Sequence, residues 1–374
     1  MKKAFMHLLV FCFILISACK KTSPGGIPPP PPPPGGGYTK INFTGTATLS
    51  EARKYLAAAA AGNKIVFAGG INASGNSKAV DIYDVSSNSW STALLSEARS
   101  ELVAASASNK IVFAGGLNAT GFSKTVDIYD VVTNTWTIAQ LSVARSALCA
   151  VASGNKIYFA GGKTNNGTTG SSKVVDIYDV SANTWTVAQL SEARMYLSAA
   201  TSGNKIIFAG GQNAATGLTT GTVDILDVSS NTWATTLLST PRYQLSAAAA
   251  GNKIVFAGGI NSTTGSGYQT ADIYDAAAGT WSTGQINVKR WGLSGTAGGN
   301  KIVFAGGFDG GPAFKLKDVD IYDVTNNTWS TSKLTESKGG MAAATAADKM
   351  LFGGGEILTG SGISNVVEIF TLSN

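Results

Sequence analysis

The sequence predicts an all-β protein, a β-propeller of seven blades with four antiparallel strands in each blade. One phrase, NKIVFAGG at residues 63–70, recurs in varied form, and its first glycine stands at residues 69, 115, 161, 210, 258, 306 and 353. Successive copies are therefore 46 to 49 residues apart, a period typical of propellers and solenoids. The chain is 44% hydrophobic and 13% charged, with 45 glycines, which argues against a coiled coil or a disordered chain and favours short strands joined by tight turns.

Residues 1–18 have the layout of a secretory signal peptide. A cationic start at Lys2 and Lys3 precedes the apolar run Leu8–Ile16, which is too short to span a bilayer permanently. The segment Ile16–Cys19 resembles the lipobox of bacterial lipoproteins. This resemblance implies cleavage before Cys19 and attachment of lipid to that residue, while the alternative is an ordinary signal peptide that happens to contain a cysteine.

Residues 19–40 are predicted to be the anchor and a tether. Seven consecutive prolines, Pro28–Pro34, favour a polyproline II helix, which at roughly 3.1 Å per residue forms a stiff spacer of about 22 Å. The predicted location is the cell envelope, with the membrane as a partner through the lipid anchor. Lys20 and Lys21 differ from the acidic retention signal of some inner-membrane lipoproteins, which favours the outer membrane, at its periplasmic side or at the cell surface.

Residues 41–374 are predicted to form the propeller, and each unit divides into strands a to d. In the first unit, small residues at 56–61 precede the β-branched run 64–68 and its glycine pair, and an alternating segment at 80–85 precedes the last strand, which Trp90 opens. Residues 57–61 are five alanines, which alone favour a helix. Residues 103–106 read VAAS in the same place, so we predict the innermost strand, where blades crowd around the axis.

The seventh unit stops before a fourth strand. Val367–Phe370 matches Val80–Tyr83, and the chain ends at Asn374. Near the N-terminus, Asn42–Arg53 aligns with Asn88–Arg99. We therefore expect the N-terminal strand to complete the last blade and close the ring, leaving no major unpaired edge.

In five units a tyrosine follows the glycine pair, and six residues separate that tyrosine from a tryptophan. These pairs are Tyr83 and Trp90, Tyr129 and Trp136, Tyr178 and Trp185, Tyr274 and Trp281, and Tyr322 and Trp329; in the fourth unit Leu226 precedes Trp233. The pattern resembles the kelch repeat, a resemblance that covers nearly all of residues 41–374 and implies a β-propeller. It implies little about function, because propellers support unrelated activities.

Several function classes lack the residues that they need. His7, the only histidine, lies in the predicted leader, which excludes histidine-based catalysis and the usual zinc sites and argues against the copper oxidases of the kelch fold. No metal or cofactor is expected. Without Lys2 and Lys3 the net charge is about +4 (26 basic minus 22 acidic residues), too diffuse to indicate nucleic-acid binding. Cys149 is predicted to be a buried thiol, and the protein is predicted to be a monomer.

Loop lengths indicate one variable face. The spacing from each tryptophan to the next arginine or lysine is always nine residues, whereas the segment after each glycine pair varies from nine to 12. In an antiparallel blade, the b–c loop and the d–a connection emerge at the same end, where binding is usually found on a rigid scaffold. The d–a connections carry a ring of cations, expected at the pore mouth: Arg53, Arg99, Arg145, Arg194, Arg242, Arg290 and Lys338. An anion site is one interpretation, but repetition in every blade favours an architectural role.

Residues that break the repeat on this face are the candidates for binding. They are Lys54, Tyr55, Glu101, Phe122, Tyr196, Tyr243, Gln244, Tyr268, Trp291, Phe308, Asp309 and Phe314, with Lys315 and Lys317 in the same variable loop. Aromatic and polar side chains on one rim could stack on a sugar or hold a peptide, so we predict non-catalytic binding of a protein or glycan. The alternatives are an envelope enzyme acting on a sugar, as sialic-acid mutarotases with this fold do, and a structural surface protein without a specific ligand.

Overall fold

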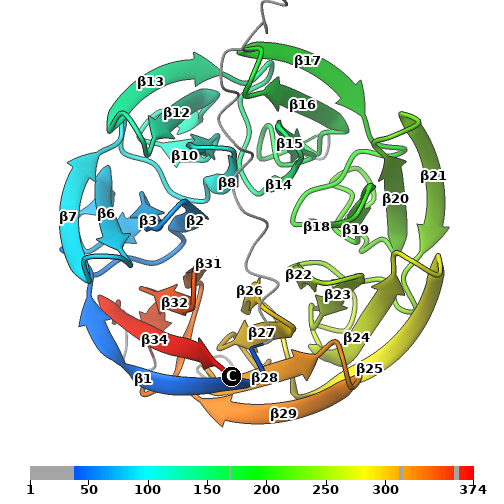
Figure 1. Cartoon of the computed structure of the whole chain (residues 1–374). Coiled ribbons are helices and arrows are strands. Elements are labelled where there is room, and N and C mark those ends of the chain that lie inside the picture. The colour runs from blue at the N-terminus through cyan, green and yellow to red at the C-terminus, as the bar shows by residue number, and fades with distance from the viewer. Residues whose placement is uncertain (1–37, 168–169, 311–314, 358–361) are drawn as a thin grey trace, which may run out of the picture.

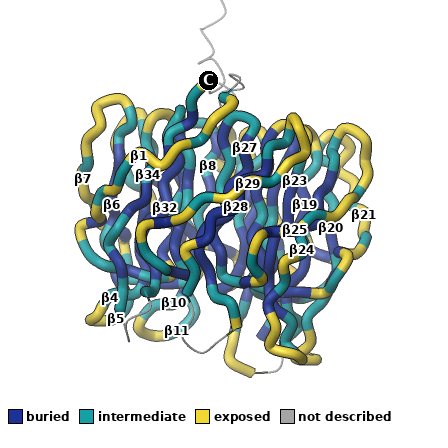
Figure 2. Tube along the Cα trace, turned by 90° about the horizontal axis from the view of Figure 1, so that it is seen from below, coloured by how far each residue is buried: buried dark blue, intermediate teal, exposed yellow. Residues whose placement is uncertain are grey.

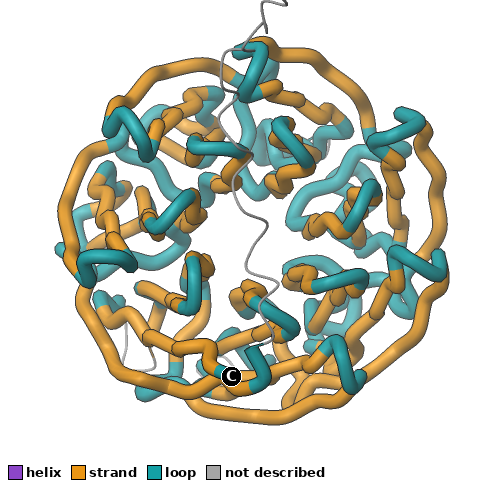
Figure 3. Tube along the Cα trace, in the orientation of Figure 1, coloured by secondary structure: helices purple, strands orange, loops and turns teal. Residues whose placement is uncertain are grey.

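The computed structural model describes residues 38–167, 170–310, 315–357 and 362–374. The predicted signal peptide, Cys19, the proline run and Phe314 lie outside the described residues. Within those ranges the chain consists of strands, turns and loops without a helix (Figure 3). Accordingly, no helix in the described part could cross a membrane.

Seven four-stranded antiparallel sheets surround a central axis (Figure 1). Each sheet is one blade, and its strands a to d follow one another from the axis outwards. We number the blades 1 to 7 along the chain, beginning with the sheet of β2, β3, β6 and β7. The predicted seven-bladed propeller with four strands per blade is thereby confirmed.

Strands a line the axis and consist mainly of alanine, serine, threonine and glycine. They are β2 (Ala57–Ala61), β8 (Val103–Ala107), β14 (Cys149–Ser153), β18 (Ser198–Ser202), β22 (Ser246–Ala250), β26 (Ser294–Gly298) and β31 (Ala342–Ala346). Neighbouring strands a pack directly against one another, so only small side chains fit between them. The five alanines of β2 are extended because this packing overrides their preference for a helix.

Strands b form the most buried layer. They are β3 (Lys64–Ala68), β9 (Lys110–Ala114), β15 (Lys156–Ala160), β19 (Lys205–Ala209), β23 (Lys253–Ala257), β27 (Lys301–Ala305) and β32 (Lys349–Gly353). In β3, Ile65, Val66 and Phe67 have no exposed surface, because both faces of the strand are covered by neighbouring blades. This explains the unbroken run of β-branched and aromatic residues in the repeat.

Strands c alternate between the two faces of a blade and end in an aspartate in blades 1 to 6. They are β6 (Ala79–Asp84), β12 (Thr125–Asp130), β16 (Val174–Asp179), β20 (Thr222–Asp227), β24 (Tyr268–Asp275), β28 (Asp318–Asp323) and β34 (Val366–Ser373). Asp84 accepts backbone hydrogen bonds from Ser86 and Ser87, which begins the turn into strand d.

Strands d form the outer rim. They are β7 (Ser89–Leu94), β13 (Thr135–Gln140), β17 (Thr184–Gln189), β21 (Thr232–Leu237), β25 (Thr280–Arg290), β29 (Thr328–Lys333) and β1 (Lys40–Thr48). The tryptophan of each strand in blades 1 to 6 turns inward; the Trp90 ring lies 5.0 Å from that of Tyr83 and 6.4 Å from that of Phe67. Where Leu226 replaces the tyrosine, Trp233 still packs 5.9 Å from Phe208, so the blade core is preserved.

The hydrophobic core lies between the blades. The described residues form seven buried clusters, one at each junction between neighbouring blades. One of them joins Val66 of blade 1 to Ile111 and Phe113 of blade 2. Each blade is therefore stabilised through its neighbours, as in other repeat architectures.

The N-terminal strand closes the ring, as predicted. β1 pairs with β34 in an antiparallel ladder that runs from Lys40 opposite Ser373 to Thr48 opposite Val366, with a bulge between Phe43 and Gly45. Blade 7 is thus built from both ends of the described chain, in the order β1-β34-β32-β31.

The glycine pairs join neighbouring blades. Gly69 and Gly70 have φ values of 66° and 104°, and a Cβ atom on Gly69 would lie 2.6 Å from the carbonyl oxygen of Arg99, which begins the next blade. The backbone amide of Gly70 donates to that oxygen at 2.8 Å. In blade 7 the equivalent residues are Gly354 and Gly355, with φ values of 69° and 112°. The alignment that placed this pair at 353 and 354 was therefore wrong by one residue, since Gly353 ends β32 where the other blades have alanine.

Candidate functional site

The disc has two faces of different character. The a–b and c–d turns form one end, which we call the turn face, and the C-terminus of the chain lies there (Figure 2). Tyr38, the first described residue, lies against Gly299 in an a–b turn, so both described ends of the chain are on the turn face. The b–c loops, including the hairpins β4 (Ile71–Asn72) with β5 (Gly75–Asn76) and β10 (Leu117–Asn118) with β11 (Gly121–Phe122), form the opposite end together with the d–a connections. We call that end the mouth face.

One residue from each blade surrounds the axis at the mouth face with a positive φ. This left-handed ring consists of Tyr55 (φ 54°), Glu101 (52°), Ala147 (51°), Tyr196 (57°), Gln244 (53°), Gly292 (60°) and Gly340 (64°). A left-handed backbone costs roughly 1–2 kcal/mol for a residue with a side chain, so the five non-glycine members require compensation.

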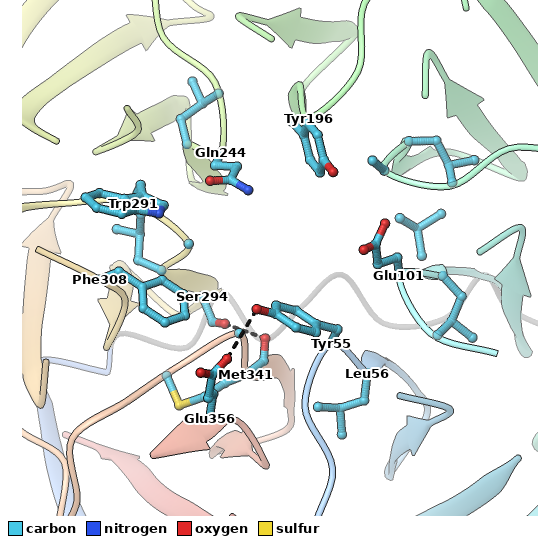
Figure 4. A pocket seen from close by; sticks show the side chains of 18 of the residues that line it. Tyr55, Leu56, Glu101, Tyr196, Gln244, Trp291, Ser294, Phe308, Met341 and Glu356 are labelled. Carbon is cyan, nitrogen blue, oxygen red and sulfur yellow. Dashed lines mark hydrogen bonds between the residues drawn. The ribbon is translucent and has the colours of Figure 1, made fainter. Parts of the chain in front are cut away.

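Backbone hydrogen bonds between neighbouring blades supply that compensation. The amides of six of the seven ring residues, all except Ala147, donate to the carbonyl of the ring residue before them, as from Glu101 to Tyr55 at 3.0 Å and from Gln244 to Tyr196 at 3.0 Å. Six such bonds, between 2.9 and 3.4 Å, run around the mouth. The side chains of Glu101, Tyr196 and Gln244 point into the space that the ring encloses (Figure 4).

The side chains of the ring surround a cavity of about 810 Å³. The residue after each member of this ring also contributes to the lining, and together they form a second, apolar ring whose side chains pack mainly between the blades: Leu56, Leu102, Leu148, Leu197, Leu245, Leu293 and Met341. Trp291, Phe308, Ser294, Val103 and Glu356 complete the lining. A concave site with apolar walls and a few polar groups is the usual form of a binding site.

Aromatic rings explain the two glycines of the left-handed ring. A Cβ atom on Gly292 would lie 2.9 Å from the ring of Phe308, and one on Gly340 would lie 2.9 Å from the ring of Tyr55. Phe308 in turn packs 6.2 Å from Trp291, ring centre to ring centre. On this side of the mouth, aromatic rings therefore occupy the space that side chains of the left-handed ring fill elsewhere.

The two carboxylates of the cavity have different surroundings. Glu356 forms ion pairs with the ammonium groups of Lys54 and Lys315, each at 3.1 Å. It also accepts a hydrogen bond from the hydroxyl of Tyr55 at 3.3 Å. Burial alone would raise the pKa of Glu356, but hydrogen bonds from these lysines hold it below its usual value. Glu101 accepts only the hydroxyl of Ser146, at 3.2 Å, and forms no ion pair with a described residue.

Tyr55 and Tyr196 remain protonated hydrogen-bond donors at neutral pH. Burial, with the charge of Glu356 as the next cause, raises the pKa of Tyr55 to about 12. Burial also raises the pKa of Tyr196 to about 12, followed by the charge of Glu101. Tyr243 packs behind Tyr196, with ring centres 6.0 Å apart.

The predicted cation ring is buried between strands and is not exposed at the pore mouth. The side chains of its seven members have no accessible surface, and each faces an acid on strand c of its own blade. The pairs are Arg53–Asp81, Arg99–Asp127, Arg145–Asp176, Arg194–Asp224, Arg242–Asp272, Arg290–Asp320 and Lys338–Glu368. Arg99 also donates to the carbonyls of Gly115 and Thr125, both at 2.7 Å, so it joins the d–a connection to strands b and c.

The remaining candidates divide between the cavity and its surroundings. Tyr55, Glu101, Tyr196, Gln244, Trp291 and Phe308 line it, whereas Lys54 and Tyr243 stand behind lining residues. Phe122, Tyr268 and Asp309 lie on the same face outside the cavity, and Phe314 is outside the described residues. The apolar ring and Glu356 were not predicted.

Two observations bear on chemistry at other positions. The described ranges contain no group of three or more His, Cys, Asp or Glu side chains arranged to hold a metal ion. Cys149 is free and buried, and burial raises the pKa of its thiol to about 12, which makes it unreactive at neutral pH.

Comparisons with known proteins identify the repeats. A family model described as the KLHDC2/KLHL20/DRC7 Kelch-repeats domain matches residues 146–355, more than half of the chain. A second model, the Kelch motif, matches residues 52–93 and 98–140. A comparison with curated proteins gives no match.

Proposed function

Since this chain belongs to the kelch-repeat family of β-propellers, which commonly bind proteins, we propose that it is a non-catalytic binding module. Its mouth face would recognise a protein or glycan partner in the cell envelope. The rigid blades hold the site, and the residues that break the repeat give it its specificity.

The left-handed ring is the observation that carries this proposal. Five residues with side chains, among them Tyr55, Glu101 and Tyr196, keep a costly backbone conformation around an open cavity. Strained residues of this kind persist where the surrounding structure enforces them, and they cluster at ligand-binding sites. Side chains fixed in this way lose little conformational entropy when a partner binds, which favours affinity.

Replacing a mouth aromatic should weaken capture of a partner. Tyr55→Ala, Tyr196→Ala and Trp291→Ala each remove one ring from the cavity lining. Stacking on an aromatic ring contributes about 0.5–1.5 kcal/mol beyond area burial, so each variant should lose roughly two- to tenfold in affinity. The measurement is the dissociation constant for a partner purified from envelope extract or selected on glycan and peptide arrays.

Variants of the turn face are the controls for this experiment. Asn63→Ala, Asn155→Ala and Asn252→Ala change a–b turns at the other end of the disc, and the left-handed residues of those turns are the preceding glycines, such as Gly62 with φ 55°. These variants should bind like the wild type, with at most a small loss of stability. Equal losses of binding from both faces would contradict the assignment of the mouth face.

The second part of the proposal concerns location. The lipobox-like segment Ile16–Cys19 supports export and lipid attachment. Because the described chain starts at Tyr38 on the turn face, an anchor that precedes it would attach the disc from that side. The mouth face would then open away from the membrane, towards a partner.

Cys19→Ala should abolish lipid attachment. Metabolic labelling with a fatty acid should mark the wild-type protein but not the variant, and the variant should move from the membrane fraction to the soluble fraction. Several acyl chains hold a protein firmly in a bilayer, whereas one chain gives only marginal binding. Label in the variant equal to that in the wild type would show that Cys19 is not the attachment site.

A further inference from the structure

We infer that the mouth cavity accepts the cationic side chain of a protein partner, a lysine or arginine, with Glu101 as its counter-ion. This inference rests on the proposed function of the mouth face and specifies the ligand. It follows from the charges that line the cavity, the walls around them and the overall charge of the protein.

Glu101 is the uncompensated charge of the described lining. The other lining carboxylate, Glu356, already contacts two ammonium groups and a phenol. Glu101 accepts one hydrogen bond, from the hydroxyl of Ser146, and its carboxylate points into the cavity (Figure 4). A partly desolvated carboxylate without a cation nearby favours a ligand that brings one, because charges attract more strongly beside apolar walls than in bulk water.

The walls suit an aliphatic stem that ends in a charge. The aromatic rings of Tyr196, Trp291 and Phe308 would contact the methylene groups of lysine or arginine, which lie along apolar surfaces while the charged end reaches a polar partner. The ring of Tyr196 lies near Glu101, since the charge of that carboxylate contributes to its raised pKa. An aromatic face beside a carboxylate can add a cation–π contact.

The overall charge of the propeller does not favour unspecific binding of cations. Residues 38–374 carry 24 basic and 22 acidic residues, a net charge of +2, and Lys54 and Lys315 stand close to the cavity. Long-range electrostatics therefore do not attract a positive ligand, so selective retention has to come from local contacts. A side chain carried by a partner protein adds contacts with the surrounding loops, including the hairpin of β4 and β5, which a free amine would lack.

The test uses short blocked peptides as probes. Acetylated and amidated pentapeptides Gly-Gly-X-Gly-Gly carry lysine, arginine or norleucine at X, and calorimetry at millimolar peptide measures their binding to the purified propeller. Norleucine has an apolar stem like that of lysine but no charge. The lysine and arginine peptides should bind about tenfold more tightly than the norleucine peptide, in line with the strength of charge-assisted hydrogen bonds.

Glu101→Gln should remove this preference without changing the fold. Glutamine keeps the size of the side chain and an oxygen that can accept from Ser146, so the melting temperature should stay the same while affinity for the lysine peptide falls about tenfold. The matched control is Glu192→Gln, which changes a glutamate outside the cavity that bonds to Thr220. This control should bind all peptides like the wild type.

Several outcomes would overturn the inference. Equal binding of the lysine and norleucine peptides, unchanged lysine binding by Glu101→Gln, or no binding of either cationic peptide would each do so. Tighter binding of free cadaverine than of the lysine peptide would assign the site to a small amine instead of a protein. A neutral oligosaccharide that binds at Tyr196 and Trp291 independently of Glu101 would replace the lysine ligand with a glycan, while the proposed function of the mouth face would stand.

Discussion

Asp127→Asn is expected to lower the free energy of unfolding by about 3–5 kcal/mol, the usual cost of leaving one partner of a buried ion pair unpaired. Asp127 faces the guanidinium of Arg99, and both side chains are almost completely buried. Its other oxygen accepts the backbone amide of Ser96 at 2.9 Å, so the carboxylate also fixes the d–a connection. Urea denaturation followed by tryptophan fluorescence measures the loss.

Lys110→Met in the same blade is the matched control. The ammonium of Lys110 lies 2.7 Å from Asp130, but both side chains remain accessible to solvent. Exposed pairs of this kind contribute about 0–1 kcal/mol, so this variant should unfold nearly like the wild type. Equal losses of stability in the two variants would show that the buried ion pair contributes no more to stability than the exposed one.

Removal of residues 38–48 should have the second large effect. The deletion takes away β1 and its eight pairings with β34, together with the contact between Phe43 and Phe370, whose ring centres are 5.7 Å apart. At roughly 0.2–1 kcal/mol for each cross-strand pair, the loss amounts to about 2–8 kcal/mol. The exposed edge of β34 should also recruit other chains, so we expect a lower melting temperature and aggregation in size-exclusion chromatography.

A deletion of Pro28–Pro34 provides the control for that experiment. These residues precede the described propeller, so their removal should leave both the melting temperature and the elution volume unchanged. An unchanged melting temperature and a monomeric elution profile after removal of residues 38–48 would mean that β1 contributes nothing to closure of the propeller ring.

The blades could be predicted from sequence because each depends on local patterns. The run at 64–68, the glycine pair and Trp90 recur at fixed spacing, and each marks a strand or a turn. The closing strand could also be predicted, since Asn42–Arg53 repeats the pattern of Asn88–Arg99. The seventh glycine pair was misplaced because three consecutive glycines, 353–355, allow two alignments.

The cation ring was placed incorrectly because sequence does not show where long side chains point. A cation in every d–a connection suggested a charged mouth, whereas each side chain is directed inwards to an acid 28 to 31 residues further along. A signal for this pairing was present in the chain. Blade 7 has lysine at 338 and glutamate at 368 where the other blades have arginine and aspartate, and this joint change indicates contact.

The left-handed ring was beyond prediction for a different reason. Its conformation depends on hydrogen bonds between residues of neighbouring blades, such as Glu101 and Tyr55, and five of its members are not glycine. Sequence singled out the two positions after each arginine, but only the second of them enters the ring in every blade. The members of the apolar ring come directly after those of the left-handed ring in sequence, and each is a leucine or methionine that could not be distinguished from other core residues of the repeat.

The joining of β1 to β34 has a consequence for how the molecule folds. Thr44 bonds to Ile369 and Thr371 across separations of 325 and 327 residues, so the last ladder joins segments at opposite ends of the propeller. Contacts of such high sequence separation form late, because the chain between them has to be ordered first. Blades 1 to 6 can assemble while the chain emerges, but blade 7 has to wait for its last residues. Until then the nascent protein carries open strand edges, and this interval is when it most needs protection from aggregation.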